Sequence, residues 1–84
     1  MSDKNVAVEF VRYVLEQICE HKSDISIESV DDDHGTLLLV RVHESDMGRL
    51  IGKEGQTISA LRTLLLSISA REHSRIRLKI EEPL

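Results

Sequence analysis

The sequence predicts an α+β domain in which a three-stranded mixed sheet carries three helices on one face. The first observation behind this prediction is a change of the apolar period between about 3.6 and about 2 along the chain, which gives the order α-β-β-α-α-β. The second is connectivity, since a short turn makes the first two strands antiparallel and a helical crossover makes the last two parallel. With 84 residues, of which 40% are hydrophobic, we expect residues 1–84 to form a single domain.

The first helix is expected from Val6 to Cys19, because apolar residues recur there in steps of three and four. Ser2 or Asp3 can cap its start. Cys19 is the only cysteine, which excludes an internal disulfide and favours a small buried side chain over a nucleophile. The spacing produces one apolar stripe, made of Val6, Phe10, Val11, Val14, Leu15 and Ile18.

Two strands are expected next. Ile25 and Ile27 alternate with polar residues, which is typical of a half-buried strand. The acidic run Asp31–Gly35 predicts a turn, since Asx side chains and glycine accept left-handed backbone. An antiparallel second strand is expected at Thr36–Val42. Its inward face carries three apolar residues, Leu38, Val40 and Val42.

Two helices of different length are expected after the hairpin. Ser45 and Asp46 offer an N-cap for a short helix that reaches Ile51. Gly52–Gly55 ends this helix, and a longer one is expected over Gln56–His73. The longer helix has one apolar stripe, made of Ile58, Leu61, Leu64, Leu65 and Ile68.

The last strand is expected at Arg75–Ile80, where apolar and basic residues alternate strictly before Pro83 ends the element. Its outer face is therefore basic, with Arg75, Arg77 and Lys79. Three leucines fall outside the predicted core faces, namely Leu37, Leu39 and Leu66. They are candidates for a self-association or partner surface, although scattered exposed apolar residues are an equal alternative.

The net charge of the chain is −4, but it is unevenly distributed. Residues 1–45 carry four basic and ten acidic side chains, whereas residues 46–80 carry seven basic and three acidic ones. The average therefore argues against a polyanionic partner, while the second half of the chain can face one.

The most informative segment is the link between the two predicted helices, Gly52–Gly55. Two glycines at this spacing predict a tight turn that presents backbone rather than side chains. Lys53 stands at its tip, and the positive dipole end of the helix that starts near Gln56 points to the same place. Together these features predict a cradle for phosphate.

The run I-G-K-E-G-Q-T-I, placed between two helices in this order of elements, resembles the loop of the KH domain in its type II topology. It is more similar still to the small bacterial single-domain KH proteins of the KhpA (YlqC) family, over nearly the whole chain. The pattern of that family reappears at Asp46, Gly48, Ile51, Gly52, Lys53, Gly55, Thr57, Leu61, Arg62, Thr63, Leu64 and Leu65.

The resemblance implies that single-stranded RNA binds with about four nucleotides gripped at the loop. The residues expected to contact RNA are Gly52, Lys53, Glu54, Gly55, Gln56, Arg49, Ile51, Ile58 and Arg62. It also implies an RNA chaperone or post-transcriptional regulator. Because the chain has neither a membrane span nor a signal-like apolar segment, we expect it to be cytoplasmic. The partners implied are a second copy of the chain and a larger KH protein of the KhpB (Jag) type, in the control of cell shape and division.

Two departures from the family pattern bear on affinity. Gln56 stands where many members have arginine, and Glu54 puts an anion beside Lys53. The two aromatic residues, Phe10 and Tyr13, both lie on the first predicted helix, so aliphatic contacts must replace base stacking. We therefore expect weak RNA binding of low specificity that falls steeply with salt.

Other functions have little support in the sequence. Asp31–Asp33 lacks the spacing of a calcium loop, the four histidines lack metal-ligand spacing, and no nucleophile elbow surrounds Ser45. We expect no catalytic residue, metal, cofactor or small-molecule substrate. The longest apolar run, Leu37–Val40, is too short for a membrane span, so no membrane association is expected. The alternative function is a protein-interaction module, a dimerisation or scaffold domain with a KH fold and little RNA affinity.

Overall fold

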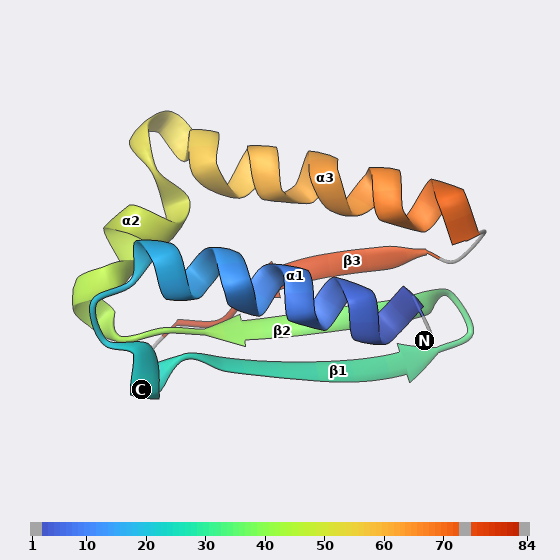
Figure 1. Cartoon of the computed structure of the whole chain (residues 1–84), viewed down its shortest axis with the longest axis horizontal. Helices are drawn as coiled ribbons and strands as arrows, with labels where there is room; N and C mark the ends of the chain where they lie inside the picture. The colour runs from blue at the N-terminus through green and yellow to red at the C-terminus, as the bar shows by residue number, and fades with distance from the viewer. Residues whose placement is uncertain (1–2, 73–74, 83–84) are drawn as a thin grey trace.

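The computed structural model describes residues 3–72 and 75–82. Three strands form one sheet, and the helices pack on one of its faces, which confirms the predicted α+β class (Figure 1). The main elements are α1 (Asp3–Ile18), β1 (Ser26–Asp32), β2 (Gly35–Arg41), α2 (Met47–Ile51), α3 (Gln56–Glu72) and β3 (Ile76–Ile80). Three short 3-10 helices join them, η1 (Lys22–Asp24), η2 (Glu44–Asp46) and η3 (Lys53–Gly55).

The sheet is mixed, with the strand order β1-β2-β3. β2 pairs with β1 in the antiparallel sense and with β3 in the parallel sense, as the connections predicted. Leu38 on β2 lies between Ser29 and Leu78 in this register. Since parallel strands need a long crossover, the whole segment α2-η3-α3 serves to return the chain from the end of β2 to the start of β3.

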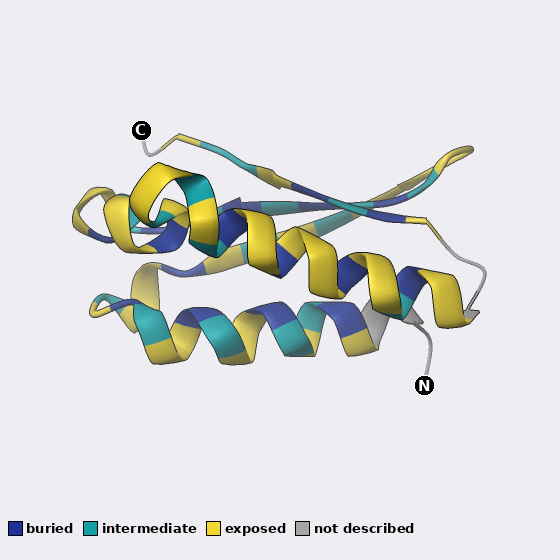
Figure 2. Cartoon of the chain, turned by 90° about the horizontal axis from the view of Figure 1, so that it is seen from above, coloured by how far each residue is buried: buried dark blue, intermediate teal, exposed yellow. Residues whose placement is uncertain are grey.

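The core lies between the sheet and the two long helices, which cover the same face (Figure 2). Each helix turns its buried residues toward the sheet and its exposed residues toward solvent. α2 closes one end of this core with Leu50, which is fully buried. The other large side chains that are fully buried include Leu15, Leu38 and Leu65, one from each remaining layer.

The opposite sheet face carries no helix within the described part of the chain, and Leu37 and Leu39 point toward it as predicted. Both are only half-buried. Leu37 lies between Val30 of β1 and Arg77 of β3 in the register. Arg77 reaches across the face to Asp32, with 2.9 Å between Nη2 and Oδ2, so its charge is paired within the chain.

The predicted hairpin turn was too long. Asp31 and Asp32 belong to β1, and only Asp33 and His34 connect the strands, since Asp32 already pairs with Gly35. The Asp32 side chain explains the tighter reversal, because its Oδ1 accepts a hydrogen bond from the backbone N–H of His34 at 2.7 Å.

Two further predictions were wrong. Asp46 does not cap α2 with its side chain, which is instead fully buried and accepts hydrogen bonds from Glu20 and His21, in the link between α1 and η1. Leu64 does not belong to the core stripe but is 50% exposed, because α3 packs with a narrower face than its apolar spacing indicates.

Cys19 is buried as expected. The predictions for Ser2, His73 and Pro83 lie outside the described residues.

No helix among residues 3–72 and 75–82 is long and apolar enough to cross a membrane.

Gly35 lets the start of β2 pass very close to the residue that precedes β3. Its φ is +122°, and a Cβ atom at this position would lie 2.2 Å from the carbonyl oxygen of Arg75. The same approach permits the hydrogen bond from the N–H of Thr36 to that oxygen, at 2.8 Å. The parallel pairing therefore begins at a point that tolerates no side chain.

Gly35→Ala should lower the free energy of unfolding by at least about 2 kcal/mol, because it adds both backbone strain and a backbone clash. Gly48→Ala is the matched control, since a Cβ there meets nothing within 4 Å and the residue lies inside α2. The control should raise the free energy of unfolding by about 0.5 kcal/mol. Urea denaturation measures both, and equal effects of the two substitutions would contradict this account of Gly35.

Candidate nucleic-acid interface

The link between α2 and α3 is a tight glycine turn, as predicted. Gly52 has φ 78° and ψ 175°, and Gly55 has φ 76°, both in regions that favour glycine. The N–H of Gly52 donates to the carbonyl oxygen of Gly48 at 2.8 Å and closes α2. The N–H of Gly55 donates to the carbonyl oxygen of Gly52 at 3.2 Å, so the loop is folded back on itself.

Gly52 also brings the loop into contact with the first turn of α3. A Cβ atom on Gly52 would lie 2.3 Å from Oγ1 of Thr57, so only glycine fits against that side chain. A Cβ on Gly55 would meet nothing within 4 Å, and Gly55 is required by its positive φ alone. The two glycines thus have different tasks, close packing in the first case and reversal of the chain in the second.

Between the glycines, Lys53 and Glu54 are exposed at the tip of the loop. Glu54 adopts the left-handed conformation, with φ 55° and ψ 26°, which glutamate favours little. α3 is 17 residues long and begins at Gln56, so its positive dipole end faces the loop. Lys53 and this helix end attract an anion to the loop, and Glu54 opposes it.

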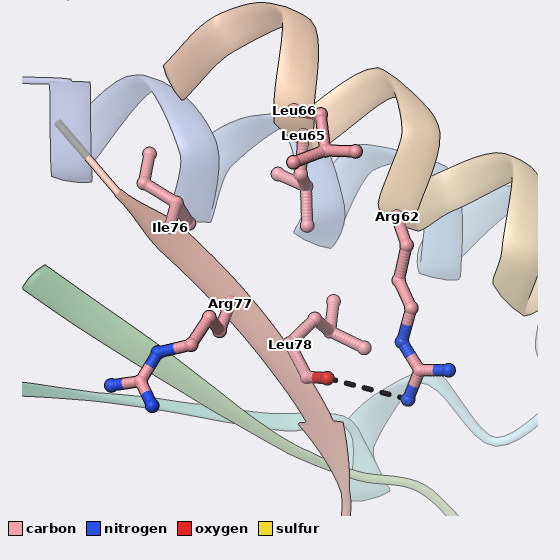
Figure 3. A pocket seen from close by; sticks show the side chains of 6 residues that line it. All are labelled: Arg62, Leu65, Leu66, Ile76, Arg77 and Leu78. Carbon is pink, nitrogen blue, oxygen red and sulfur yellow. Dashed lines mark hydrogen bonds between the residues drawn. The ribbon is translucent and has the colours of Figure 1, made fainter. Parts of the chain in front are cut away.

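An apolar pocket of about 320 Å³ lies between α3 and β3, beyond the loop along α3 (Figure 3). We call it the α3–β3 pocket, and its lining residues are Arg62, Leu65, Leu66, Ile76, Arg77 and Leu78. Nη2 of Arg62 donates to the carbonyl oxygen of Leu78 at 3.4 Å, while the guanidinium of Arg77 points away from it. Arg62 is therefore the cation that stands over the apolar lining.

The pocket adjoins the open edge of the sheet. The carbonyl oxygen of Arg75 and the N–H of Glu81 bond to β2, so alternate residues between them do the same in a parallel ladder. Leu78 and Ile80, which lie between those residues, direct their backbone groups away from β2. This edge offers hydrogen-bonding groups next to an apolar surface, a combination suited to unstacked bases.

A second hollow, also about 320 Å³, lies on the other side of α3. We call it the α1–α3 pocket, and its lining residues are Val14, Gln56, Thr57, Ala60, Leu61 and Leu64. None of these six described residues is basic. The two sides of α3 therefore differ, since Arg62 lines the α3–β3 pocket while the lining of the α1–α3 pocket has no basic residue.

The structure brings together some of the predicted site residues and separates others. Arg62 lines the α3–β3 pocket, and Ile51 is 39% exposed at the entry to the loop. Ile58 is part of the core, and only 7% of it is accessible, so it has little surface to offer a base. Arg49 turns toward the segment that follows α1, where it pairs with Glu20 at 2.7 Å.

Leu78 and Ile76 were predicted only as core residues and not as part of this surface. Both are indeed buried, but they also form the floor of the α3–β3 pocket. Their position on the last strand, with α3 directly before it, was the available signal. Leu66, which stood among the self-association candidates, lines the same pocket, whereas Leu37 and Leu39 lie on β2 and face the opposite side of the sheet.

No group of three or more His, Cys, Asp or Glu side chains that could hold a metal ion occurs among the described residues.

Comparison with known proteins points to nucleic acid. The family profile described as "KhpA/KhpB, KH domain" matches residues 8–80. An RNA-binding protein KhpA of Chlamydia pneumoniae is 36% identical over 74 residues, which cover 88% of this chain and 95% of that protein. An RNA-binding protein KhpA of Halalkalibacterium halodurans is 33% identical, covering 83% of this chain and 92% of its own length. An RNA-binding protein KhpA of Listeria monocytogenes is 31% identical, with coverages of 88% and 97%.

Glu54→Asn should raise the free energy of unfolding by about 0.5 kcal/mol relative to Glu54→Gln, because asparagine accepts the left-handed conformation more readily. Both substitutions remove the same charge, so the difference between them isolates the backbone at this position. Thermal denaturation followed by circular dichroism measures it. Equal melting temperatures would show that the left-handed conformation of Glu54 carries no cost.

Proposed function

The chain belongs to the KhpA/KhpB KH-domain family, and on that premise we propose that it binds single-stranded RNA at the Gly52–Gly55 loop. The observation that carries the proposal is the geometry of this loop. A tight glycine turn exposes Lys53 beside the first turn of a 17-residue helix, so a cation and the positive end of the helix dipole lie where a phosphate can sit.

The bases are proposed to lie along α3 toward β3. An RNA strand that leaves the loop and follows the β3 side of α3 reaches Arg62 and then the α3–β3 pocket. The leucine and isoleucine side chains of that pocket can contact a base, and the open edge of β3 can hydrogen-bond to it. Phe10 and Tyr13 lie on α1, so no aromatic side chain stacks on a base here, and affinity per nucleotide should be low.

Electrostatics restricts binding to this region. The chain as a whole is negative, while residues 46–80 carry a net charge of +4 and include both the loop and Arg62. The acidic remainder should repel polyanions from other surfaces. The interaction is therefore proposed to be local, salt-sensitive and of low sequence specificity.

The wider biological role rests on the family resemblance. We propose an RNA chaperone or post-transcriptional regulator that acts in the cytoplasm, together with a KhpB (Jag)-type partner, in the control of cell shape and division. RNA binding is the activity printed in the names of the curated relatives, and those names carry no enzymatic activity.

We also propose that the chain self-associates through the α1–α3 side of α3. Leu64 is 50% exposed there, beside an apolar pocket without basic lining, which suits a second copy of the same apolar surface better than RNA. Leu66 is 64% exposed but stands on the pocket that Arg62 adjoins, and Leu37 and Leu39 lie on the far sheet face. Leu66 therefore lies on a different surface from Leu37 and Leu39.

Lys53→Asp should weaken binding of labelled oligo-U and oligo-A by at least about tenfold, because it reverses the charge at the phosphate site. Lys22→Asp is the matched control, since Lys22 is also an exposed first residue of a 3-10 helix and changes the net charge equally. The control should stay within about twofold of the wild type. Fluorescence anisotropy measures both affinities.

A salt titration of the wild type should give a slope of log affinity against log salt between roughly −1.4 and −2.8, as expected for two to four phosphates. A flat salt response, or equal losses for Lys53→Asp and Lys22→Asp, would favour the alternative of a protein-interaction module.

Leu64→Arg should weaken self-association by at least about tenfold, because a charge would enter the centre of the apolar contact. Leu66→Arg is the matched control on the opposite side of the same helix and should leave the oligomer intact. Light scattering over a range of concentrations gives the oligomeric state, and RNA affinity per chain should be unchanged by Leu64→Arg. The reverse pattern would place the interface on the α3–β3 side.

A further inference from the structure

We propose that Asp46 is a positioning residue for RNA binding, because its buried carboxylate fixes α2, and with it the Gly52–Gly55 loop, against the end of α1. This inference rests on the proposed RNA function of the loop. Asp46 is 0% exposed and lies on η2, six residues before the first glycine of the loop. It does not line the loop or either pocket described above, and its effect on RNA would therefore be indirect.

α2 needs such an anchor because it has little stability of its own. It is five residues long, and Leu50 is its one buried residue. A helix of this length does not persist without tertiary contacts. The direction of α2, and the place where it delivers the chain to Gly52, must therefore be set by what its first turn contacts.

The carboxylate of Asp46 makes this contact with His21 and Glu20, which precede it in the chain by 25 and 26 residues. Its Oδ2 accepts a hydrogen bond from the N–H of His21 at 2.9 Å, and its Oδ1 accepts one from the N–H of Glu20 at 3.1 Å. Nδ1 of His21 lies 3.2 Å from the same Oδ2. Two backbone groups that follow α1 thus have a buried anion as their partner, and the loss of either bond would leave a donor unsatisfied.

Arg49 supplies a second connection, one turn further along α2. Its Nη1 lies 3.5 Å from Oδ1 of Asp46, and its Nη2 lies 2.7 Å from Oε1 of Glu20. Arg49 thereby offsets the buried charge and ties the middle of α2 to the same turn. Since Gly52 directly follows Ile51, the last residue of α2, a rotation of α2 about Asp46 would carry the loop with it.

Two histidines enclose the other side of this cluster. The His21 ring stacks on the His43 ring, with centroids 3.8 Å apart and planes 12° apart. Nδ1 of His43 accepts the N–H of Ser45 at 3.0 Å, which holds the start of η2. Burial raises the pKa of Asp46, but the hydrogen bonds from His21 and Glu20 outweigh it and leave that pKa below its usual range. The charged form is thus the one that these contacts hold.

The test is Asp46→Asn, which keeps the size of the side chain but turns one acceptor into a donor and removes the charge opposite Arg49. Asp24→Asn is the control, an exposed aspartate on the neighbouring η1. Asp46→Asn should weaken binding of labelled oligo-U by about tenfold, as displaced supporting groups commonly do. The control should leave the affinity unchanged.

A double-mutant cycle separates positioning from a general loss of stability. In the Lys53→Asp background, measured at low ionic strength where the weak complex remains observable, Asp46→Asn should cause little further loss, because the loop no longer holds RNA. Amide hydrogen exchange should accelerate at Gly52–Gly55 and along α2 while Leu38 and Leu15 keep their protection. An equal loss in both backgrounds, or faster exchange throughout the sheet, would overturn the proposal.

The exchange measurement also separates the two proposals. If the wild type binds neither homopolymer, the RNA function fails, yet faster exchange confined to α2 and the loop would still establish that Asp46 positions them. If RNA binds but exchange at the loop does not respond to Asp46→Asn, the positioning role fails and the RNA function stands.

Discussion

The parallel pairing of β2 with β3 is the constraint on which the rest of the structure depends. Because the two strands run in the same direction, the chain must leave β2 at one end of the sheet and return to β3 at the other. α3 performs this return, and the glycine turn before it therefore lies at the end where β2 leaves the sheet (Figure 1). The position of the loop and the existence of a pocket between α3 and the edge strand both follow from this one connection.

Local patterns in the sequence predicted most of the elements, because period and turn chemistry act over a few residues. The alternation of Arg75–Ile80 and the glycine spacing of Gly52–Gly55 each correspond to an observed element, with boundaries shifted by a residue or so. The direction of the strands was also predictable, since a hairpin and a crossover leave little choice.

What the sequence could not predict depends on distant partners. Asp46 stands where the sequence predicts an N-cap, and only its contacts with Glu20 and His21, which follow α1 more than 20 residues earlier in the chain, make it a buried acceptor. Arg49 likewise lies close to the loop in the sequence, but its side chain pairs with Glu20 in the segment after α1. Leu64 fits the apolar period of α3, yet the neighbouring elements leave its side of the helix uncovered. In each case the sequence spacing predicted the approximate position of the residue, and the packing of distant elements determined its contacts.

One side of α3 carries the α1–α3 pocket, whose lining holds no basic residue, and the other side carries the α3–β3 pocket with Arg62. Contact between two chains through the α1–α3 side would leave the α3–β3 pocket of each chain open. Such a pair would hold two short stretches of RNA at once, and the second stretch would bind at the high local concentration created by the first. A domain with low affinity for a single RNA strand would then, as a pair, bring two separate RNA segments together.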